Sequence, residues 1–187
     1  TLLELRERAL RCVATDGHRL ALCETPVDLE GTSRRQVIIP RKGVLELQRL
    51  LDAGDGTVDV EFGRNHVRVR RGDFTSKLID GRFPDYEAVI PLGADKSFRV
   101  GRDDLRAALQ RAAILSNEKF RGVKLELTPN RLNIVAHNPE QEEAVEELEV
   151  QTIVDGLSVG FNVNYLLDAL GALRGAETEI ALRDGNS

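Results

Sequence analysis

The sequence predicts an α+β protein that contains two copies of one domain. Short runs alternate apolar and polar residues and are separated by turn residues, which is the pattern of antiparallel hairpins. Apolar residues recur at helical spacing in three other segments. A shift of 122 positions places residues 3–14 on 125–136 without a gap and preserves the hydrophobic pattern. Each copy is therefore expected to lay a helix on a sheet face.

The repeat continues far beyond the first strands. At the same offset, residues 45–63 fall on 167–185 with the hydrophobic positions in register. A constant offset over this length indicates a duplicated domain rather than a short solenoid unit. The segment 98–119 precedes the second copy, and its counterpart would lie before Thr1. The first copy also continues past the counterpart of Ser187, so we expect a fragment of a longer multidomain protein.

In the first copy, Asp16 and Gly17 supply the turn between two alternating arms. Pro40 fits the first turn of a helix whose Val44, Leu47 and Leu51 share one apolar face. The expected strands are residues 1–5, 9–14, 20–27, 36–39, 57–62, 66–70 and 74–79.

In the second copy, Asp103 is a suitable helix cap. The buried stripe of that helix is expected to comprise Leu105, Ala108, Leu109 and Ala112, with Arg102, Arg106 and Gln110 on the opposite side. A further helix follows, with an apolar side made of Tyr165, Leu166, Ala169, Leu170 and Leu173. The expected strands are residues 98–100, 123–127, 131–137, 142–150, 157–161 and 178–183. The Pro/Gly-containing segment 91–96 suggests a linker, which divides the chain into domains at 1–92 and 93–187.

Composition narrows the class of protein. The 187 residues are 41% hydrophobic and carry a net charge of -5. This charge argues against a protein that binds nucleic acid over its whole surface, because strong binders usually have a basic face. The charge is segregated, with paired basic residues at 34–35, 41–42 and 70–71 and an acidic run at 140–149. No apolar run is long enough to span a membrane, and a cytoplasmic protein is expected. Cys12 and Cys23 lie on the two arms of a hairpin and are interpreted as reduced.

Catalytic and metal-binding patterns are weak. The three histidines lack partners at metal-ligand spacing, and no phosphate-binding glycine pattern occurs. Asp16 and His18 could join a distant serine in a hydrolase, but a turn histidine is the favoured interpretation. We therefore predict a non-enzymatic protein with no metal and no cofactor. The acidic run fits either a solvated edge strand or a docking surface for a basic partner.

Six segments together resemble one protein family. They are residues 14–20, 40–43, 80–86, 114–122, 138–143 and 160–163, in collinear order. The sequence is similar in all of them to the bacterial sliding clamps, the beta subunits of DNA polymerase III. The resemblance implies a DNA-clamp fold in which helices line a channel around duplex DNA and antiparallel sheets form the outside. It also implies a head-to-tail homodimer of three-domain subunits.

By this resemblance, residues 1–92 are the middle clamp domain without its N-terminal part, and 93–187 are the C-terminal domain without its last strands. The implied function is that of a processivity factor, which slides on duplex DNA and performs no chemistry. The replicative polymerase, clamp loader and repair proteins would dock through short motifs of the Gln-Leu-x-Leu-Phe type in a hydrophobic pocket. The alternative is a peptide-binding scaffold of clamp-like fold that does not encircle DNA.

The resemblance also implies site residues. The peptide-binding pocket would contain Thr15, Gly17, His18, Arg19, Leu20, Pro84, Val89, Phe120, Asn162 and Tyr165. The DNA channel would contain Arg41, Lys42, Arg102 and Arg106. The dimer interface would contain Ile114, Leu115, Glu140, Glu142, Glu143 and Glu146. The sequence departs from the family by two residues fewer after Phe74, a change that preserves strand parity.

Overall fold

The computed structural model describes residues 1–6, 8–27, 34–52, 56–70, 72–117, 119 and 121–183. The chain divides into two compact units, Thr1–Ile90 and Pro91–Ser187. In the described residues, the first unit combines one helix and the second unit two helices with antiparallel sheets, which confirms the predicted α+β class.

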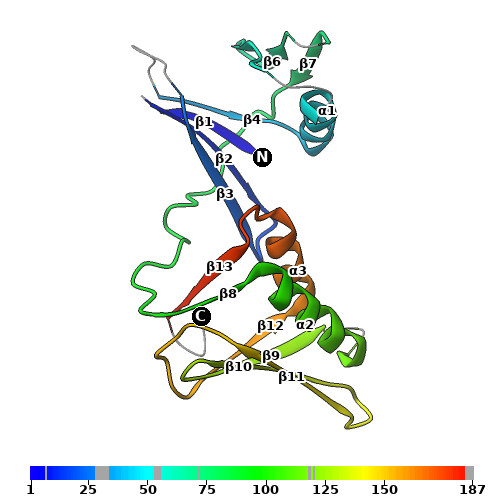
Figure 1. Cartoon of the computed structure of the whole chain (residues 1–187). Helices are drawn as coiled ribbons and strands as arrows, with labels where there is room; N and C mark the ends of the chain where they lie inside the picture. Colours follow the sequence, from blue (N-terminus) through cyan, green and yellow to red (C-terminus); the bar gives the residue numbers. More distant parts are fainter. Residues whose placement is uncertain are drawn as a thin grey trace. The chain divides into compact units, whose positions relative to one another are not determined.

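The first unit begins with a four-stranded antiparallel sheet. Its strands are β1 (Leu2–Arg6), β2 (Ala9–Thr15), β3 (Leu20–Pro26) and β4 (Arg35–Ile38), in the order β3-β2-β1-β4 (Figure 1). Leu2 lies opposite both Val13 and Ile38, which sets the register of the buried face. Cys12 lies opposite Cys23, and both are free thiols. Burial raises the pKa of Cys12.

The remainder of the first unit is a helix with a small sheet. These elements are α1 (Arg41–Asp52), β5 (Val60–Phe62), β6 (His66–Val69) and β7 (Phe74–Lys77), with the strands in the order β5-β6-β7. Gly43 is buried where α1 meets β7, and a Cβ there would lie 2.6 Å from Ser76 Oγ. The glycine therefore allows the close approach of helix and strand.

Two expectations for this region were wrong. Leu51 is 39% exposed, whereas Val44 and Leu47 of the same predicted face are half-buried. Periodicity identifies an apolar face but does not specify what covers it. Residues 57–59 lie outside β5, which begins at Val60.

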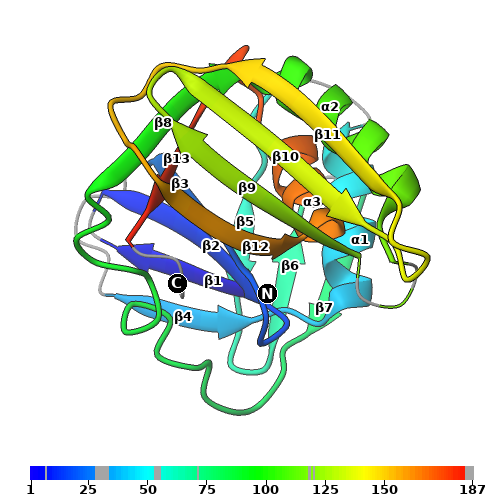
Figure 2. The same cartoon turned by 90° about the horizontal axis from the view of Figure 1, so that it is seen from below.

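Within the described part of the chain, the second unit contains two sheets and two helices. Its elements are β8 (Lys96–Gly101), α2 (Arg102–Leu115), β9 (Gly122–Thr128), β10 (Arg131–His137), β11 (Glu143–Glu149), β12 (Leu157–Asn162), α3 (Val163–Ala172) and β13 (Glu177–Leu182). The main sheet has the order β11-β10-β9-β12, and β13 pairs with β8 (Figure 2). Helices α2 and α3 lie against one face of the main sheet (Figure 1).

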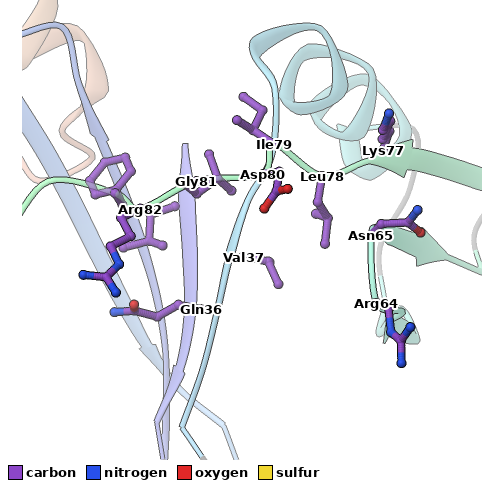
Figure 3. Close-up of a pocket in the computed structure, with 13 residues that line it drawn as sticks. Gln36, Val37, Arg64, Asn65, Lys77, Leu78, Ile79, Asp80, Gly81 and Arg82 are labelled. Carbon is purple, nitrogen blue, oxygen red and sulfur yellow. The ribbon is translucent and has the colours of Figure 1, made fainter.

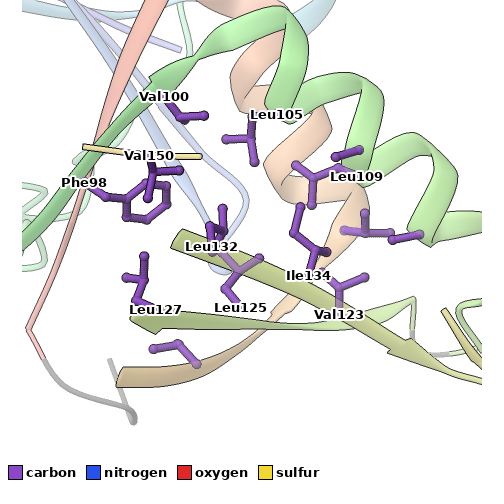
Figure 4. Close-up of a cluster of buried hydrophobic side chains, with 14 of the residues drawn as sticks. Phe98, Val100, Leu105, Leu109, Val123, Leu125, Leu127, Leu132, Ile134 and Val150 are labelled. Carbon is purple, nitrogen blue, oxygen red and sulfur yellow. The ribbon is translucent and has the colours of Figure 1, made fainter. Parts of the chain in front are cut away.

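The core of the second unit lies between these helices and the sheet (Figure 4). All four residues of the predicted α2 stripe are buried, which confirms that prediction: Leu105, Ala108, Leu109 and Ala112. Asp103 does not cap the helix, because α2 begins at Arg102 and Gly101 occupies the N-cap position. In α3, Leu170 is buried, but the predicted Ala169 and Leu173 are exposed.

The two main sheets confirm the internal repeat. Strands β3-β2-β1-β4 and β11-β10-β9-β12 have the same order relative to the chain. Strand β2 covers residues 9–15 and β10 covers 131–137, so their bounds differ by the 122 positions found in the sequence. A helix follows the last strand of each sheet, α1 after β4 and α3 after β12.

Candidate functional site

The turn between β2 and β3 is fixed by its own side chains. Thr15 Oγ1 donates to the carbonyl of Arg19 at 2.8 Å and accepts from the backbone N–H of Gly17 at 3.1 Å. Asp16 Oδ1 accepts from the backbone N–H groups of His18 and Arg19, each at 3.1 Å. These bonds, that from His18 first, lower the pKa of Asp16. The carboxylate therefore shapes a turn on which His18 and Arg19 are exposed.

Leu20 links this turn to a distant segment of the same unit. It packs against a small cluster whose buried members are Leu2, Val13 and Tyr86. Phe83 joins the same cluster, and its ring meets that of Tyr86 edge to face with centroids 6.4 Å apart. The fold thus brings the β2–β3 hairpin and residues 83–86 together.

Pro84 and Val89 flank Tyr86 on the surface. Both are exposed, and Val89 has 67% of its surface accessible. The backbone N–H of Val89 donates to the carbonyl of Tyr86 at 3.3 Å. An apolar side chain as open as Val89 can receive an apolar group of a partner without displacing core residues.

A network around Glu4 was not predicted from the sequence. The Glu4 carboxylate is fully buried and accepts from the Tyr86 hydroxyl at 2.6 Å. Gln36 Nε2 donates to the other carboxylate oxygen at 2.8 Å, as does Arg34 Nε at 2.7 Å. Arg6 Nη2 lies 3.1 Å from Glu4 Oε2. Both carboxylate oxygens are therefore satisfied, as a buried charge requires.

The network extends outward through a second arginine. Arg11 Nη1 donates to the Tyr86 hydroxyl at 2.9 Å and to Glu87 Oε1 at 3.0 Å, and Arg11 also pairs with Glu24. Burial opposes the charge of Glu4, but its hydrogen bonds from Tyr86, Gln36 and two arginines outweigh burial and lower its pKa to about 2. The carboxylate is therefore charged at neutral pH.

In the second unit, Asn162 and Tyr165 lie at the start of α3. Asn162 caps the helix, because its Oδ1 accepts from the backbone N–H of Asn164 at 2.9 Å. Asn162 also borders a hollow of about 390 Å³ over β9, β10 and β12. Tyr165 is half-buried in the first turn of α3. Phe120, the remaining residue predicted for the pocket in this unit, lies outside the described residues.

A further hollow lies in the first unit. It measures about 780 Å³ and is lined by Leu2, residues 36–38, 64–65 and 77–83 (Figure 3). Gln36 and Val37 of β4 line one side, and Arg64 and Asn65 line the other (Figure 3). Its lining reaches Phe83, next to Pro84, but includes none of the described residues predicted for the pocket.

The predicted dimer residues gather at the C-terminal end of α2. Ile114 is 80% exposed, and Leu115 is half-buried. Both line a groove of about 410 Å³ with Pro139 and Glu140 from the β10–β11 connection. An exposed apolar side chain beside an acidic edge suits an interface with an apolar centre and a charged rim.

The acidic residues predicted for the dimer interface differ in their hydrogen-bond and ion-pair partners. Glu146 accepts hydrogen bonds from Arg111 of α2, which lowers the pKa of Glu146. Glu142 accepts from Asn138 Nδ2 at 2.6 Å, and Glu143 lies 3.8 Å from His137. Glu140 is exposed at the groove.

The four residues predicted to face DNA differ in exposure and in their contacts within the protein. Arg41 and Lys42 are exposed in the first turn of α1, and Arg106 is exposed on α2. Arg102 instead donates to the carbonyl of Leu173 at 2.9 Å and pairs with Asp103. Arg102 therefore links the start of α2 to the C-terminal end of α3 within the same unit.

Within the described ranges, no three His, Cys, Asp or Glu side chains form a group that could hold a metal ion. None of the helices in this part of the chain is long and apolar enough to cross a membrane.

The sequence matches two domain families in succession. Residues 1–85 match the family described as DNA polymerase III beta subunit, central domain. Residues 87–187 match DNA polymerase III beta subunit, C-terminal domain. Together these two matches cover nearly the whole chain.

Curated relatives are similar over the full chain. The beta sliding clamp of Pseudomonas putida is 52% identical over 188 residues, which cover 100% of this chain and 51% of that protein. The beta sliding clamp of Escherichia coli K12 is 51% identical over the same length and with the same coverage. The chain thus spans about half the length of these relatives.

Solved structures have the same fold. DNA polymerase III subunit beta from Pseudomonas aeruginosa has a TM-score of 0.95 and 52% identity, covering 100% of this chain and 51% of that chain. The sliding clamp of that organism bound to griselimycin matches equally well. The Caulobacter crescentus clamp has a TM-score of 0.88 and 41% identity, covering 96% of this chain and 49% of that chain. The chain therefore belongs to the family of DNA polymerase III beta subunits, the beta sliding clamps.

Proposed function

We propose that this chain is part of a processivity factor for a replicative DNA polymerase, a ring-shaped homodimer that encircles duplex DNA and slides along it. The observation that carries the proposal is similarity over the whole chain to proteins named beta sliding clamp. The duplicated sheet topology fits this role, because a ring needs near-equivalent domains around its axis. The protein would act in the cytoplasm and without catalysis.

The DNA contacts in this proposal are few and independent of sequence. Arg41, Lys42 and Arg106 are exposed and can meet phosphates, which position a protein without reading bases. Each phosphate neutralised contributes about 0.9 to the salt slope of binding. A sliding protein benefits from few such contacts, since tight ones oppose movement. A net charge of -5 is consistent with retention by topology rather than by affinity.

Partner proteins would bind through the predicted pocket. In the first unit, exposed Val89 and Pro84 and half-buried Leu20 offer apolar contacts beside the rigid turn that carries His18 and Arg19. This mixture suits a short peptide whose apolar side chains enter pockets while its backbone is held by polar groups. A solved relative was crystallised with griselimycin bound. The polymerase, the clamp loader and repair proteins are the proposed partners.

The decisive experiment measures retention on DNA. The full-length protein is loaded on circular duplex DNA with the clamp loader and ATP, and the circle is then cut. We expect stable retention on the circle and rapid loss after linearisation. Equal retention on both forms would indicate an ordinary DNA-binding protein. Peptide binding without retention on the circle would indicate a scaffold that does not encircle DNA.

The proposed homodimer can be tested at the groove lined by Ile114 and Leu115. In the full-length protein, Ile114→Ala combined with Leu115→Ala is expected to weaken dimerisation at least tenfold, because it removes the apolar centre of the interface. Exposed ion pairs contribute only about 0.2 to 1 kcal/mol each and cannot replace it. Sedimentation velocity at several concentrations measures the shift to monomer. Ile153→Ala, at a site 97% exposed, is the control, and an unchanged dimer in the double variant would refute the assignment.

A further inference from the structure

We propose that Tyr86 is a positioning residue that holds the Pro84–Val89 segment in the shape that receives a peptide. The inference rests on the proposed peptide-binding function and adds to it a residue outside the predicted pocket. Tyr86 itself is 4% exposed, so it does not contact a partner directly. Its role would be to fix the two exposed residues that flank it.

The segment depends on side chains for its shape. Residues 80–90 belong to no helix or strand, so no ladder of backbone hydrogen bonds defines their path. Such connecting segments are the more mobile parts of a protein unless other contacts hold them. The bond from the Val89 N–H to the Tyr86 carbonyl forms a local turn that carries Val89. Fixing Tyr86 therefore also fixes Val89.

The ring of Tyr86 provides the apolar contact with the sheet. It is buried in a cluster with Leu2 and Val13, and Leu20 and Phe83 pack around it. Leu20 follows the β2–β3 turn directly. The same cluster therefore sets the position of the 84–89 segment relative to the β2–β3 hairpin, which carries the other predicted pocket residues of this unit.

The hydroxyl of Tyr86 provides the directional contact. It donates to Glu4 Oε2 at 2.6 Å and accepts from Arg11 Nη1 at 2.9 Å and from Arg6 Nη2 at 3.2 Å. Hydrogen bonds to charged groups are shorter and stronger than neutral ones. Because Glu4 and Arg11 lie on neighbouring strands β1 and β2, the hydroxyl is fixed relative to two strands at once.

Glu87 adds a second attachment next to the first. Its carboxylate pairs with Arg6 and Arg11, the two arginines that contact the Tyr86 hydroxyl. The carboxylates of Glu4, Glu24 and Glu87 balance the guanidinium groups of Arg6, Arg11 and Arg34. The side chain of Glu87 is 52% exposed, so its pairs are weaker than the buried contact of Tyr86.

The consequence for binding follows from preorganisation. A partner binds only the fraction of molecules in which the segment has the receptive shape, and its apparent affinity falls in proportion to that fraction. Removing the Tyr86 hydroxyl leaves the ring in the cluster but removes its directional bonds. The segment then samples other shapes while the sheet remains folded.

The test uses Tyr86→Phe in the full-length protein. A fluorescent peptide containing a Gln-Leu-x-Leu-Phe motif is titrated, and anisotropy gives its dissociation constant. We expect about fivefold weaker binding, the result of a receptive fraction reduced to about one fifth. Hydrogen exchange should become faster at the Val89 amide and stay unchanged at β9 and β10.

Two further variants keep the test decisive. Glu87→Gln changes an exposed side chain and leaves the core intact, and it should weaken peptide binding by a smaller factor. Glu147→Gln, which breaks the exposed pair with Arg131 in the other unit, is the matched control and should have no effect on peptide binding. If the unmodified protein binds no peptide, the proposed function fails. If it binds peptide and neither Tyr86→Phe nor Glu87→Gln alters affinity or Val89 exchange, the inference about Tyr86 is overturned.

Discussion

Replacement of Glu4 by glutamine is expected to lower the free energy of unfolding of the first unit by about 3 kcal/mol at pH 7. Glutamine resembles the protonated carboxyl group in shape and charge. The difference between the folded pKa of about 2 and the ordinary 4.5 measures how strongly the fold prefers the charged form. The variant also leaves Arg6 and Arg34 without their buried counter-charge. Arg34 is 61% exposed and Arg6 keeps its pair with Glu87, so the loss of counter-charge adds little to the cost set by Glu4 itself.

The same group makes a defined contribution to pH dependence. Because the folded pKa is below the unfolded one, the stabilisation by Glu4 is fully present above about pH 4.5 and is lost as the pH falls towards about 2. Glu4→Gln should therefore unfold with a shallower dependence on pH between these values. The carboxyls of Asp16 and Glu146, whose pKa values are also lowered, are present in both proteins. The difference between the two profiles thus reports Glu4 together with Glu87, whose lowered pKa depends on the same Arg6.

The change in the free energy of unfolding of the first unit is measured by chemical denaturation, with hydrogen exchange of the amides in β1 and β2 as the readout. Glu147→Gln is the matched control, because it removes the same charge from a side chain that is 55% exposed and paired with Arg131. That variant should change the unfolding free energy by less than about 1 kcal/mol. Equal stabilities of Glu4→Gln and Glu147→Gln would mean that Glu4 is effectively solvated in solution.

The sequence predicted the fold best where one element covers another within the same unit. The stripe of α2 from Leu105 to Ala112 is buried because a sheet lies beneath it. The similar pattern of α1 left Leu51 exposed, because in the described residues this helix meets only a small sheet. The cap at Asp103 was wrong for a local reason, since the chain already turns into the helix at Gly101.

The Glu4 network shows what local patterns cannot predict. The alternating pattern of β1 assigned no role to Glu4. The structure buries it with a tyrosine 82 positions away, in a segment outside any helix or strand. Arg34 and Gln36 complete the site from β4 and the residues before it. Position 4 can hold a buried charge only because residues far away in the chain supply its hydrogen bonds.

In the candidate pocket, too, some features could be predicted from the sequence and others required the structure. The rigid turn at Asp16 and Gly17 could be predicted from turn chemistry, and Gly17 has a φ of 89°. That Leu20 and Phe83 share a cluster required the structure, because their positions are far apart in the chain. The assignment of Pro84, Val89, Asn162 and Tyr165 to a peptide pocket came from resemblance and stays a prediction.

Phe98→Ala is expected to be among the most destabilising substitutions in the second unit. Phe98 is fully buried on β8, where it pairs with Ile180 of β13 and packs among the residues of the large cluster (Figure 4). Truncation loses the transfer free energy of the ring and leaves a cavity. Such substitutions cost about 3 to 5 kcal/mol. For a unit of this size, the midpoint of thermal unfolding should fall by more than about 10 °C.

The cost of Phe98→Ala depends on whether the neighbours of the ring can move into the space. Val100 lies on the same strand, and Leu127 and Leu132 lie across the sheet below, each in a regular ladder that resists collapse. We therefore expect a value near the upper end of the range, with faster hydrogen exchange in β8–β13 and in β9–β10. Ile153→Ala removes an apolar side chain that is 97% exposed and should leave stability unchanged. If Phe98→Ala lowers the free energy of unfolding by less than about 1 kcal/mol, β8 and β13 do not pack on this core in solution.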